Sequence, residues 1–247
     1  MGAVIGTAGW SIAATAAGAF PAEGSSLERY AAVFNGAEIN SSFHRPHRTS
    51  TWARWKASVP PGFRFSVKLP KAISHERKLA GCGELVERFL DEANGLGDAL
   101  AVLLLQLPPK LAFEPALAED FLADLSERTA ARTACEPRHP SWFEPEADAL
   151  LARLAVARVA ADPSVVPAAA EPGGWRGLAY WRLHGSPAMY RSAYGPERLE
   201  PVAEAIERAV LSRADAWCMF DNTASSAATG DALALSARLA AISGSGR

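Results

Sequence analysis

The chain has 247 residues, of which 49% are hydrophobic and 21% are charged. This is the composition of an ordinary globular protein, and a chain of this length can bury a large core without a disulfide or a metal ion. The formal net charge of −2 argues against a protein that binds nucleic acid through a broadly basic face, although it leaves room for a local basic patch.

Three cysteines, Cys82, Cys135 and Cys218, lie far apart and lack Cys-x-x-Cys spacing. Because they are odd in number, we expect buried free thiols in a reducing compartment. The first residues lack the basic region of a signal peptide, and the longest apolar stretch, 99–105, is too short to span a bilayer. We therefore expect a cytoplasmic protein with no membrane partner.

Short apolar runs alternate with amphipathic segments along the chain. The runs that predict strands cover residues 4–7, 36–40, 63–68, 100–106, 133–136, 158–162, 178–184 and 216–222. Helical periodicity or a proline-led first turn predicts helices over residues 27–34, 50–58, 83–95, 115–128, 145–154, 196–211 and 231–241. This alternation predicts parallel pairing through right-handed crossovers, and eight units predict a (β/α)₈ barrel of the TIM type.

The predicted barrel covers residues 4–242 of a single domain, 1–247. Residues 163–177 are rich in Pro, Ala and Gly, which predicts an irregular sixth βα unit, and the tail, 243–247, is expected to be disordered. An open doubly wound sheet is the alternative fold. It would require a Gly-x-Gly-x-x-Gly turn, which Gly6-Thr7-Ala8-Gly9-Trp10 does not supply.

Polar side chains stand at the carboxyl ends of seven predicted strands, the end at which TIM barrels build their active sites. They are Asn40, Lys68, Gln106, Arg138, Asp162, His184 and Asn222. A second group lies one layer deeper and consists of Glu38, Ser66, Glu136 and Arg182. In the last strand, period-two alternation separates Asn222 from Asp221, and Asn222 is the predicted site residue.

The deeper charges also have a structural interpretation, in which buried carboxylates neutralise buried arginines. The candidate carboxylates are Glu38, Glu136 and Asp162, and the candidate arginines are Arg64, Arg138 and Arg182. We favour this interpretation for the deeper layer. For the layer at the strand ends we favour function, because burying diverse polar groups without partners is costly.

All five histidines follow predicted strand ends, and the loops after the second and third strands are basic. Together these loops form a basic rim, which consists of His44, Arg45, His47, Arg48, Lys68, Lys71, His75, Arg77 and Lys78. The chain has only five lysines, and three of them lie in this rim. Because a compact ammonium suits a phosphate or a carboxylate, the rim indicates a small anionic ligand, the alternative being a solvated basic loop.

Several short motifs occur in a specific order: Ile5-Gly6-Thr7-Ala8-Gly9-Trp10, Glu38-Ile39-Asn40-Ser41-Ser42-Phe43, Phe63-Arg64-Phe65-Ser66-Val67-Lys68, Ile73-Ser74-His75-Glu76-Arg77, Leu105-Gln106-Leu107-Pro108-Pro109, Glu136-Pro137-Arg138-His139-Pro140-Ser141-Trp142 and Arg182-Leu183-His184-Gly185. On these motifs the chain, over residues 4–223, resembles the bacterial YecE-like family, a domain of unknown function. The resemblance implies a TIM-type barrel and no particular reaction.

The resemblance also implies a set of recurrent polar positions: Glu38, Asn40, Lys68, His75, Gln106, Glu136, Arg138, Arg182, His184 and Asn222. The chain departs from the family pattern in the first loop, residues 11–18, and at His44, Pro137 and Asp221. We therefore expect a rim that differs from that of its relatives.

Three functions are compatible with these residues. The first is a pocket for a phosphate or carboxylate ligand, in an acid–base enzyme with His184 or His75 assisted by Glu38 or Glu136. The residues expected to bind the ligand are Asn40, Lys68, Gln106, Arg138, Asp162, Arg182 and Asn222, with Trp10 as a wall or a core anchor.

The second function is a metal-dependent phosphodiesterase, endonuclease or sugar isomerase, with nucleic acid among the substrates. Its ligands to a divalent ion would be Glu38, Glu136, Asp162 and His184, although the sequence lacks a His-x-His spacing and otherwise requires no cofactor. The third is a non-catalytic module that binds a ligand or a partner. The oligomeric state stays open.

Overall fold

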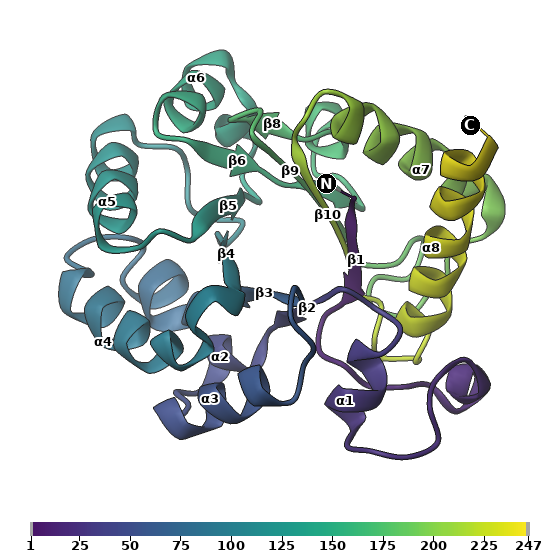
Figure 1. Ribbon diagram of the computed structural model, residues 1–247. Helices are drawn as coiled ribbons and strands as arrows, with labels where there is room; N and C mark the ends of the chain where they lie inside the picture. Colours follow the sequence, from purple (N-terminus) through teal and green to yellow (C-terminus); the bar gives the residue numbers. More distant parts are fainter. Residues whose placement is uncertain (1, 246–247) are drawn as a thin grey trace.

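The computed structural model describes residues 2–245 and has an α/β fold, with strands inside and helices around them (Figure 1). The strands are β1 (Val4–Thr7), β2 (Gly36–Ile39), β3 (Arg64–Lys68), β4 (Leu100–Gln106), β5 (Arg132–Glu136), β6 (Val156–Arg158), β7 (Ala160–Asp162), β8 (Gly173–Gly174), β9 (Leu178–Leu183) and β10 (Asp215–Phe220). The α-helices are α1 (Ser26–Ala31), α2 (Ser41–His44), α3 (Thr49–Ala57), α4 (Gly83–Ala93), α5 (Pro115–Arg128), α6 (Pro145–Arg153), α7 (Pro196–Leu211) and α8 (Ala228–Ser245).

The strands form two sheets of mainly parallel strands. One sheet has the order β1-β10-β9-β7, and the other has the order β2-β3-β4-β5-β6-β8, in which the short β8 runs antiparallel to β6. The predicted sixth strand is present as β6 and β7, which are separated by Val159 and belong to different sheets. The predicted parallel pairing between consecutive strands is therefore confirmed.

The two sheets contact each other at both of their junctions. At the first, Ala8 and Glu38 form a parallel bridge, and the amide of Gly9 donates to the carbonyl oxygen of Glu38 at 2.7 Å. At the second, the chain passes directly from β6 to β7, and the amide of Val159 donates to the Cys135 carbonyl oxygen of the other sheet at 2.8 Å.

Glycine is required where β1 approaches β2. A methyl group built on Gly6 would lie 2.1 Å from the carbonyl oxygen of Gly36, and one built on Gly36 would lie 2.3 Å from Val4 Cγ1. Because no side chain fits between these two backbones, the glycine pair sets the distance between the edges of the two sheets.

Apolar side chains pack in two layers. One layer joins the strands to the surrounding helices and includes Ile39, Val67, Cys218 and Phe220. The other lies between the two sheets and consists of Val4, Val102, Leu104, Ala134, Ala157, Val159, Leu178, Tyr180, Trp217 and Met219. The inward faces of the strands are therefore defined by residues of both sheets that touch one another.

An ion-pair cluster closes the amino end of this interior. The carboxylate of Asp215 is buried at the start of β10 and accepts hydrogen bonds from Arg64, Arg132 and the indole Nε1 of Trp217. The expected pairing of Arg64 with a carboxylate at the strand carboxyl ends is thus wrong, because Arg64 opens β3 at the opposite end and meets Asp215 there.

The predicted starts of α5, α6 and α7 agree with the structure, whereas α8 begins at Ala228, before the predicted residue 231. Ser25 and Glu28 form a capping box at α1, and proline occupies the first turn of α5, α6 and α7. The predicted irregular unit holds a 3₁₀ turn, Pro167–Ala170, and β8 in place of an α-helix. Residues 243–245 belong to α8, and residues 246–247 lie outside the described part, so the expected disorder of the tail stays a prediction.

The three cysteines are buried free thiols, as predicted. Within residues 2–245, no helix is both long enough and apolar enough to cross a lipid bilayer. The organisation as a single domain stays a prediction.

Candidate functional site

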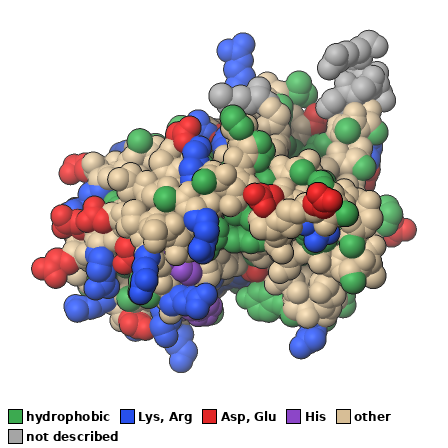
Figure 2. Space-filling model, turned by 60° about the horizontal axis from the view of Figure 1, so that its bottom comes forward, with side chains coloured by type: hydrophobic (Ala, Val, Ile, Leu, Met, Phe, Trp, Pro, Cys, Tyr) green, Lys and Arg blue, Asp and Glu red, His purple; other side chains and the backbone are tan. Residues whose placement is uncertain are grey.

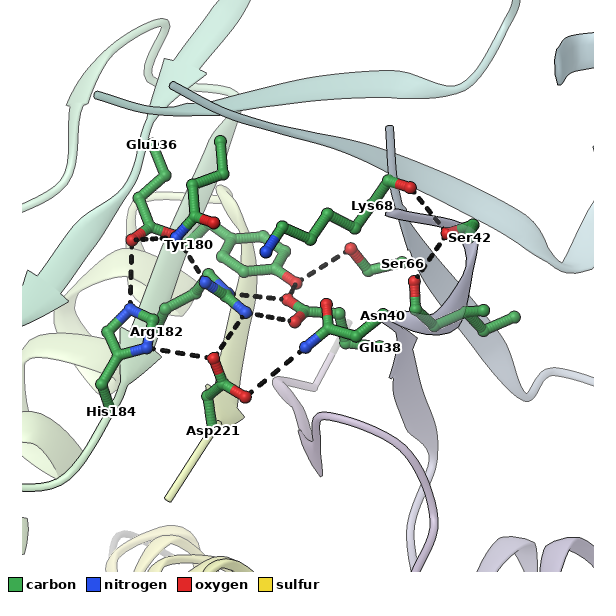
Figure 3. A network of polar contacts seen from close by, with 12 residues as sticks. Glu38, Asn40, Ser42, Ser66, Lys68, Glu136, Tyr180, Arg182, His184 and Asp221 are labelled. Atoms are coloured by element: carbon green, nitrogen blue, oxygen red, sulfur yellow. Dashed lines mark hydrogen bonds and ion pairs between the residues drawn. The ribbon is translucent and has the colours of Figure 1, made fainter. Parts of the chain in front are cut away.

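Arg182 lies at the centre of a buried group of charges at the carboxyl ends of the strands (Figure 3). Its Nε and Nη2 donate to the two carboxylate oxygens of Glu38 at 3.0 and 2.6 Å, and its Nη1 donates to Glu136 Oε2 at 2.6 Å. Nη2 also donates to Asp221 Oδ2 at 3.0 Å. We call Arg182, these three carboxylates and His184 the Arg182 cluster.

The members of the Arg182 cluster come from both sheets, because period-two alternation points them inward. Arg182 belongs to β9 and has the same parity as the inward-facing Tyr180. Glu38 comes from β2 and Glu136 from β5, and Asp221 directly follows β10 with the parity of Trp217 and Met219. The cluster therefore lies directly above the apolar layer between the sheets.

The charges within the cluster stabilise one another. Burial alone would lower the pKa of Arg182, but Glu38, Glu136 and Asp221 outweigh it and hold this pKa well above the usual range. Burial would raise the pKa of Glu136, but Arg182, His184 and Arg138 hold it well below the usual range. The sequence-based pairing of Glu38 and Glu136 with Arg182 and Arg138 is present in the structure.

His184 lies between two carboxylates of the cluster and is fully buried. Its Nδ1 is 3.1 Å from Asp221 Oδ2, and its Nε2 is 3.0 Å from Glu136 Oε1 and 2.7 Å from Arg138 Nη2. As an imidazolium it donates to both carboxylates, whereas as a neutral ring it donates from Nδ1 and accepts at Nε2 from Arg138. At Nε2 the ring lies against both the Arg138 donor and the Glu136 acceptor, so each protonation state satisfies one of these two contacts and not the other.

Lys68 is a cation without a carboxylate partner. It ends β3, the residue is 9% exposed, and its Nζ lies 4.1 Å from the centre of the Phe43 ring. Among residues 2–245, no carboxylate lies within ion-pair distance of its ammonium. Burial first, and then the charge of Arg182, lower the pKa of Lys68.

Asn40 is the neighbour of Lys68 across the sheet, one residue beyond the paired Ile39 and Val67. Its amide Nδ2 donates to Asp221 Oδ1 at 3.4 Å. Its carbonyl Oδ1 is buried and, among the described residues, has no hydrogen-bond donor. Because buried polar atoms normally have a partner, this oxygen is free to accept a hydrogen bond from a bound molecule.

Two further groups complete the site. Gln106 Nε2 donates to Glu136 Oε1 at 3.2 Å, so this predicted residue lies beside the cluster. Below the cluster, the Tyr180 hydroxyl lies 2.9 Å from both Glu38 Oε2 and Ser66 Oγ. Burial and the charge of Glu38 raise the pKa of Tyr180, which keeps this hydroxyl neutral.

Tyr190, in the loop between β9 and α7, covers His184. The two rings meet edge to face with their centres 5.7 Å apart, and the Tyr190 backbone has a φ of 65°. A bulky residue with a left-handed backbone is uncommon and occurs mainly where the surroundings enforce it. Here the Tyr190 amide hydrogen-bonds to the His184 carbonyl oxygen, which fixes the ring over the site.

Comparison with known proteins shows the family to which the chain belongs. The family model "Protein of unknown function DUF72" matches residues 4–245. The chain belongs to the DUF72 family. This confirms the resemblance found in the sequence motifs.

The DUF72 chain is similar to curated and to solved proteins. It is 34% identical to the UPF0759 protein YecE of Escherichia coli (strain K12) over 120 residues, which are 48% of this chain and 43% of YecE, so the match spans less than half of that relative. The same identity is found with the YecE protein of Escherichia coli O157:H7.

Two crystal structures of DUF72 family proteins share the fold. The protein from Thermotoga maritima MSB8 has a TM-score of 0.78 and 23% identity, over 97% of this chain and all of the other. The protein from Enterococcus faecalis V583 has a TM-score of 0.78 and 19% identity, over 96% and 95% of the two chains.

Two predicted site residues of the DUF72 chain point away from the Arg182 cluster. Asp162 accepts hydrogen bonds from the Tyr194 hydroxyl at 2.6 Å and from Arg198, on the side of α7. Asn222 donates to Asp231 at 2.6 Å and to the Ser192 carbonyl oxygen at 2.9 Å. Asp221, next to Asn222, takes the inward position. A binding role for Asp162 and Asn222 stays a prediction.

Two other predicted site residues, His75 and Trp10, pack against aromatic rings and not against the cluster. The His75 ring meets the Phe43 ring edge to face with centres 5.0 Å apart, and burial followed by the charges of Lys68 and Lys71 lowers its pKa. Trp10 packs edge to face against Trp55 and Phe65, which matches the role of a core anchor.

Three of the four residues considered as metal ligands, Glu38, Glu136 and His184, lie in the Arg182 cluster, but they are arranged around an arginine. Glu38 and Glu136 both bond to Arg182, while Asp162 lies on the other side of its strand. In the described part of the chain, no group of three His, Cys, Asp or Glu side chains is arranged to hold a metal ion. This donor set does not fit a divalent ion, because an arginine occupies the oxygens that would bind it.

The basic rim is partly assembled. On the face shown in Figure 2, histidine side chains lie among Lys and Arg side chains. A small cavity of about 150 Å³ is lined by residues that include His44, Arg45, His47, Lys71 and Arg88. Lys71 pairs with Glu76 at 3.3 Å, however, so the rim is less cationic than its sequence suggests.

Proposed function

We propose that this DUF72 chain binds a small anionic ligand at the carboxyl ends of its strands, above the Arg182 cluster, and that its two sheets close into one eight-stranded (β/α)₈ barrel. Three observations support closure: the Ala8–Glu38 bridge, the passage from β6 to β7, and the apolar layer shared by both sheets. In a barrel of this type, active sites lie at the carboxyl ends of the strands.

The main support for the proposal is the environment of Lys68. Arg182 is neutralised by three carboxylates and Arg138 by Glu136, whereas Lys68 is nearly buried and has no carboxylate partner among the described residues. A buried ammonium without a partner is costly, and a ligand carboxylate or phosphate removes that cost. Beside it, the free carbonyl oxygen of Asn40 suits a ligand hydroxyl or amine.

His184 supplies the acid–base chemistry in this proposal. It lies between Glu136 and Asp221 and is covered by Tyr190, so a proton on its ring is held by carboxylates and shielded from water. The site is therefore that of an enzyme that moves a proton on a small anionic molecule. Binding without turnover would instead assign the chain to non-catalytic ligand-binding modules.

Thermal unfolding with added anions tests the proposal. We expect inorganic phosphate, glycolate, pyruvate or glycerol phosphate to stabilise the wild type, by about 2.7 kcal/mol at 100 times the dissociation constant. The shift should vanish in Lys68→Met, which keeps the hydrocarbon stem of the side chain, and persist in Lys110→Met, which removes an exposed lysine. Equal shifts in all three proteins, or no shift in any, would overturn the assignment.

A further inference from the structure

We propose that Lys68 forms an imine with its substrate, and that the substrate is a small carbonyl compound that also carries a carboxylate or phosphate. This inference rests on the proposed anion site and names the substrate class for it. The amine is held at a strand end, between the Phe43 ring and the Arg182 cluster, with no carboxylate partner among the described residues.

A lysine must lose its proton before it can attack a carbonyl carbon. Desolvation and a neighbouring cation are the two conditions that enlarge the fraction of free amine, and both act on Lys68. Burial and the charge of Arg182 lower its pKa, and each unit of lowering multiplies the amine fraction about tenfold at neutral pH. Lys56 and Lys71, by contrast, pair with Asp98 and Glu76.

The reaction balances without an oxidant or a reductant. The lysine nitrogen bonds to the carbonyl carbon while the carbonyl oxygen takes a proton, which gives a carbinolamine. A second proton converts its hydroxyl into water, which leaves, and the nitrogen lone pair forms the C=N bond of the iminium ion. The nitrogen gives up one of its own protons, in balance with the proton taken by the carbonyl oxygen, so the sum is amine plus carbonyl plus one proton to protonated imine plus water.

The neighbouring residues suit these proton transfers. His184 belongs to the same group of residues, because Asp221 contacts both His184 Nδ1 and the Asn40 amide. In this inference His184 gives the proton to the departing hydroxyl. Asn40 Oδ1, which has no donor among the described residues, accepts from the carbinolamine hydroxyl.

The charge balance of the site also favours an iminium ion. The three carboxylates of the cluster face three cations, Arg182, Arg138 and Lys68. An iminium ion at Lys68 retains the positive charge of the ammonium, so imine formation leaves this balance unchanged. Arg138, which is paired with Glu136 and whose side chain is 11% exposed, borders the same group of residues.

Borohydride trapping tests the inference. Pyruvate, glyoxylate and dihydroxyacetone phosphate would each be incubated with the protein and sodium borohydride, and the reduced adduct located by peptide mass mapping. We expect the adduct on Lys68 to exceed that on each other lysine by about tenfold for each unit of pKa lowering. It should be retained in Lys110→Arg and lost from Lys68→Arg, which keeps the charge but cannot form this imine.

The controls separate failure of this inference from failure of the anion site. Inorganic phosphate and glycolate have no carbonyl group, so they report on anion binding alone and should reduce trapping by competition. Suppose that phosphate and glycolate stabilise the wild type. If none of the three carbonyl probes is then trapped on Lys68, or if trapping is spread evenly over the five lysines, the imine is excluded and the anion site stands. If no anion stabilises the protein and nothing is trapped, both proposals are wrong.

Discussion

Replacing Arg182 by methionine is expected to lower the free energy of unfolding by about 3–5 kcal/mol, the usual cost of removing one partner from a buried ion pair. Arg182 is fully buried and donates to Glu38, Glu136 and Asp221. Without it, three carboxylates are left close together in the interior with too few cations. Urea unfolding followed by circular dichroism measures this loss.

Two further variants make the Arg182 result specific. Arg153→Met breaks an exposed pair with Glu119 and is expected to change stability little, because exposed ion pairs are screened by solvent. Arg182→Lys restores the charge but offers one nitrogen where three nitrogens now donate, so it should recover part of the loss. A loss in Arg182→Met no larger than that in Arg153→Met would contradict the structural role given to the cluster.

Gly6→Ala is the second substitution expected to have a large effect. It should lower the free energy of unfolding by about 1–3 kcal/mol or more. The added methyl group would lie 2.1 Å from the carbonyl oxygen of Gly36, and this neighbour is backbone that cannot rotate away. The edges of the two sheets would have to separate, so the substitution also probes the closure of the barrel.

Gly18→Ala is the matched control for the Gly6 experiment, because a methyl group at Gly18 meets no atom within 4 Å. The difference between the two midpoints of urea unfolding measures the cost of crowding at the junction. If the two proteins unfolded at the same urea concentration, β1 and β2 would not approach as closely as described.

The strand pattern predicted the architecture because parallel strands covered on both faces read as continuous apolar runs. The end of the chain was harder to predict. Residues 228–230 are Ala-Thr-Gly, which carry no helical periodicity, yet α8 begins at Ala228. Its first residues are placed by tertiary contacts, such as the hydrogen bond from Thr229 Oγ1 to the Ser11 carbonyl oxygen.

The orientation of half of the site residues could be predicted from the alternation of side chains within single strands. In β9 and β3, charged residues alternate with apolar ones, so the faces that carry Arg182, His184 and Lys68 are unambiguous. In residues 217–220, by contrast, both faces are apolar. The pattern separated Asp221 from Asn222 correctly but gave no means of telling which face looks inward.

The same ambiguity applies to Asp162. The preceding residues, Val159, Ala160 and Ala161, are all small or apolar, and the charged Arg158, which has the parity of Asp162, does not by itself tell which face looks inward. In the structure Ala157 and Val159 face inward, and the period of two then turns Asp162 outward to Tyr194 and Arg198. Tyr190 could not be predicted as part of the site, because its position depends on the folded loop rather than on a strand register.

The charge state of Lys68 in solution tests the central claim most directly. With five lysines in the chain, reductive methylation with ¹³C-formaldehyde gives a simple NMR spectrum, and the Lys68 signal is identified by its loss in Lys68→Arg. We predict that this signal titrates at a lower pH in the folded protein than in urea, because burial and Arg182 lower its pKa, and that inorganic phosphate or glycolate shifts it. A Lys68 signal that titrates alike in both states and ignores both anions would contradict the account.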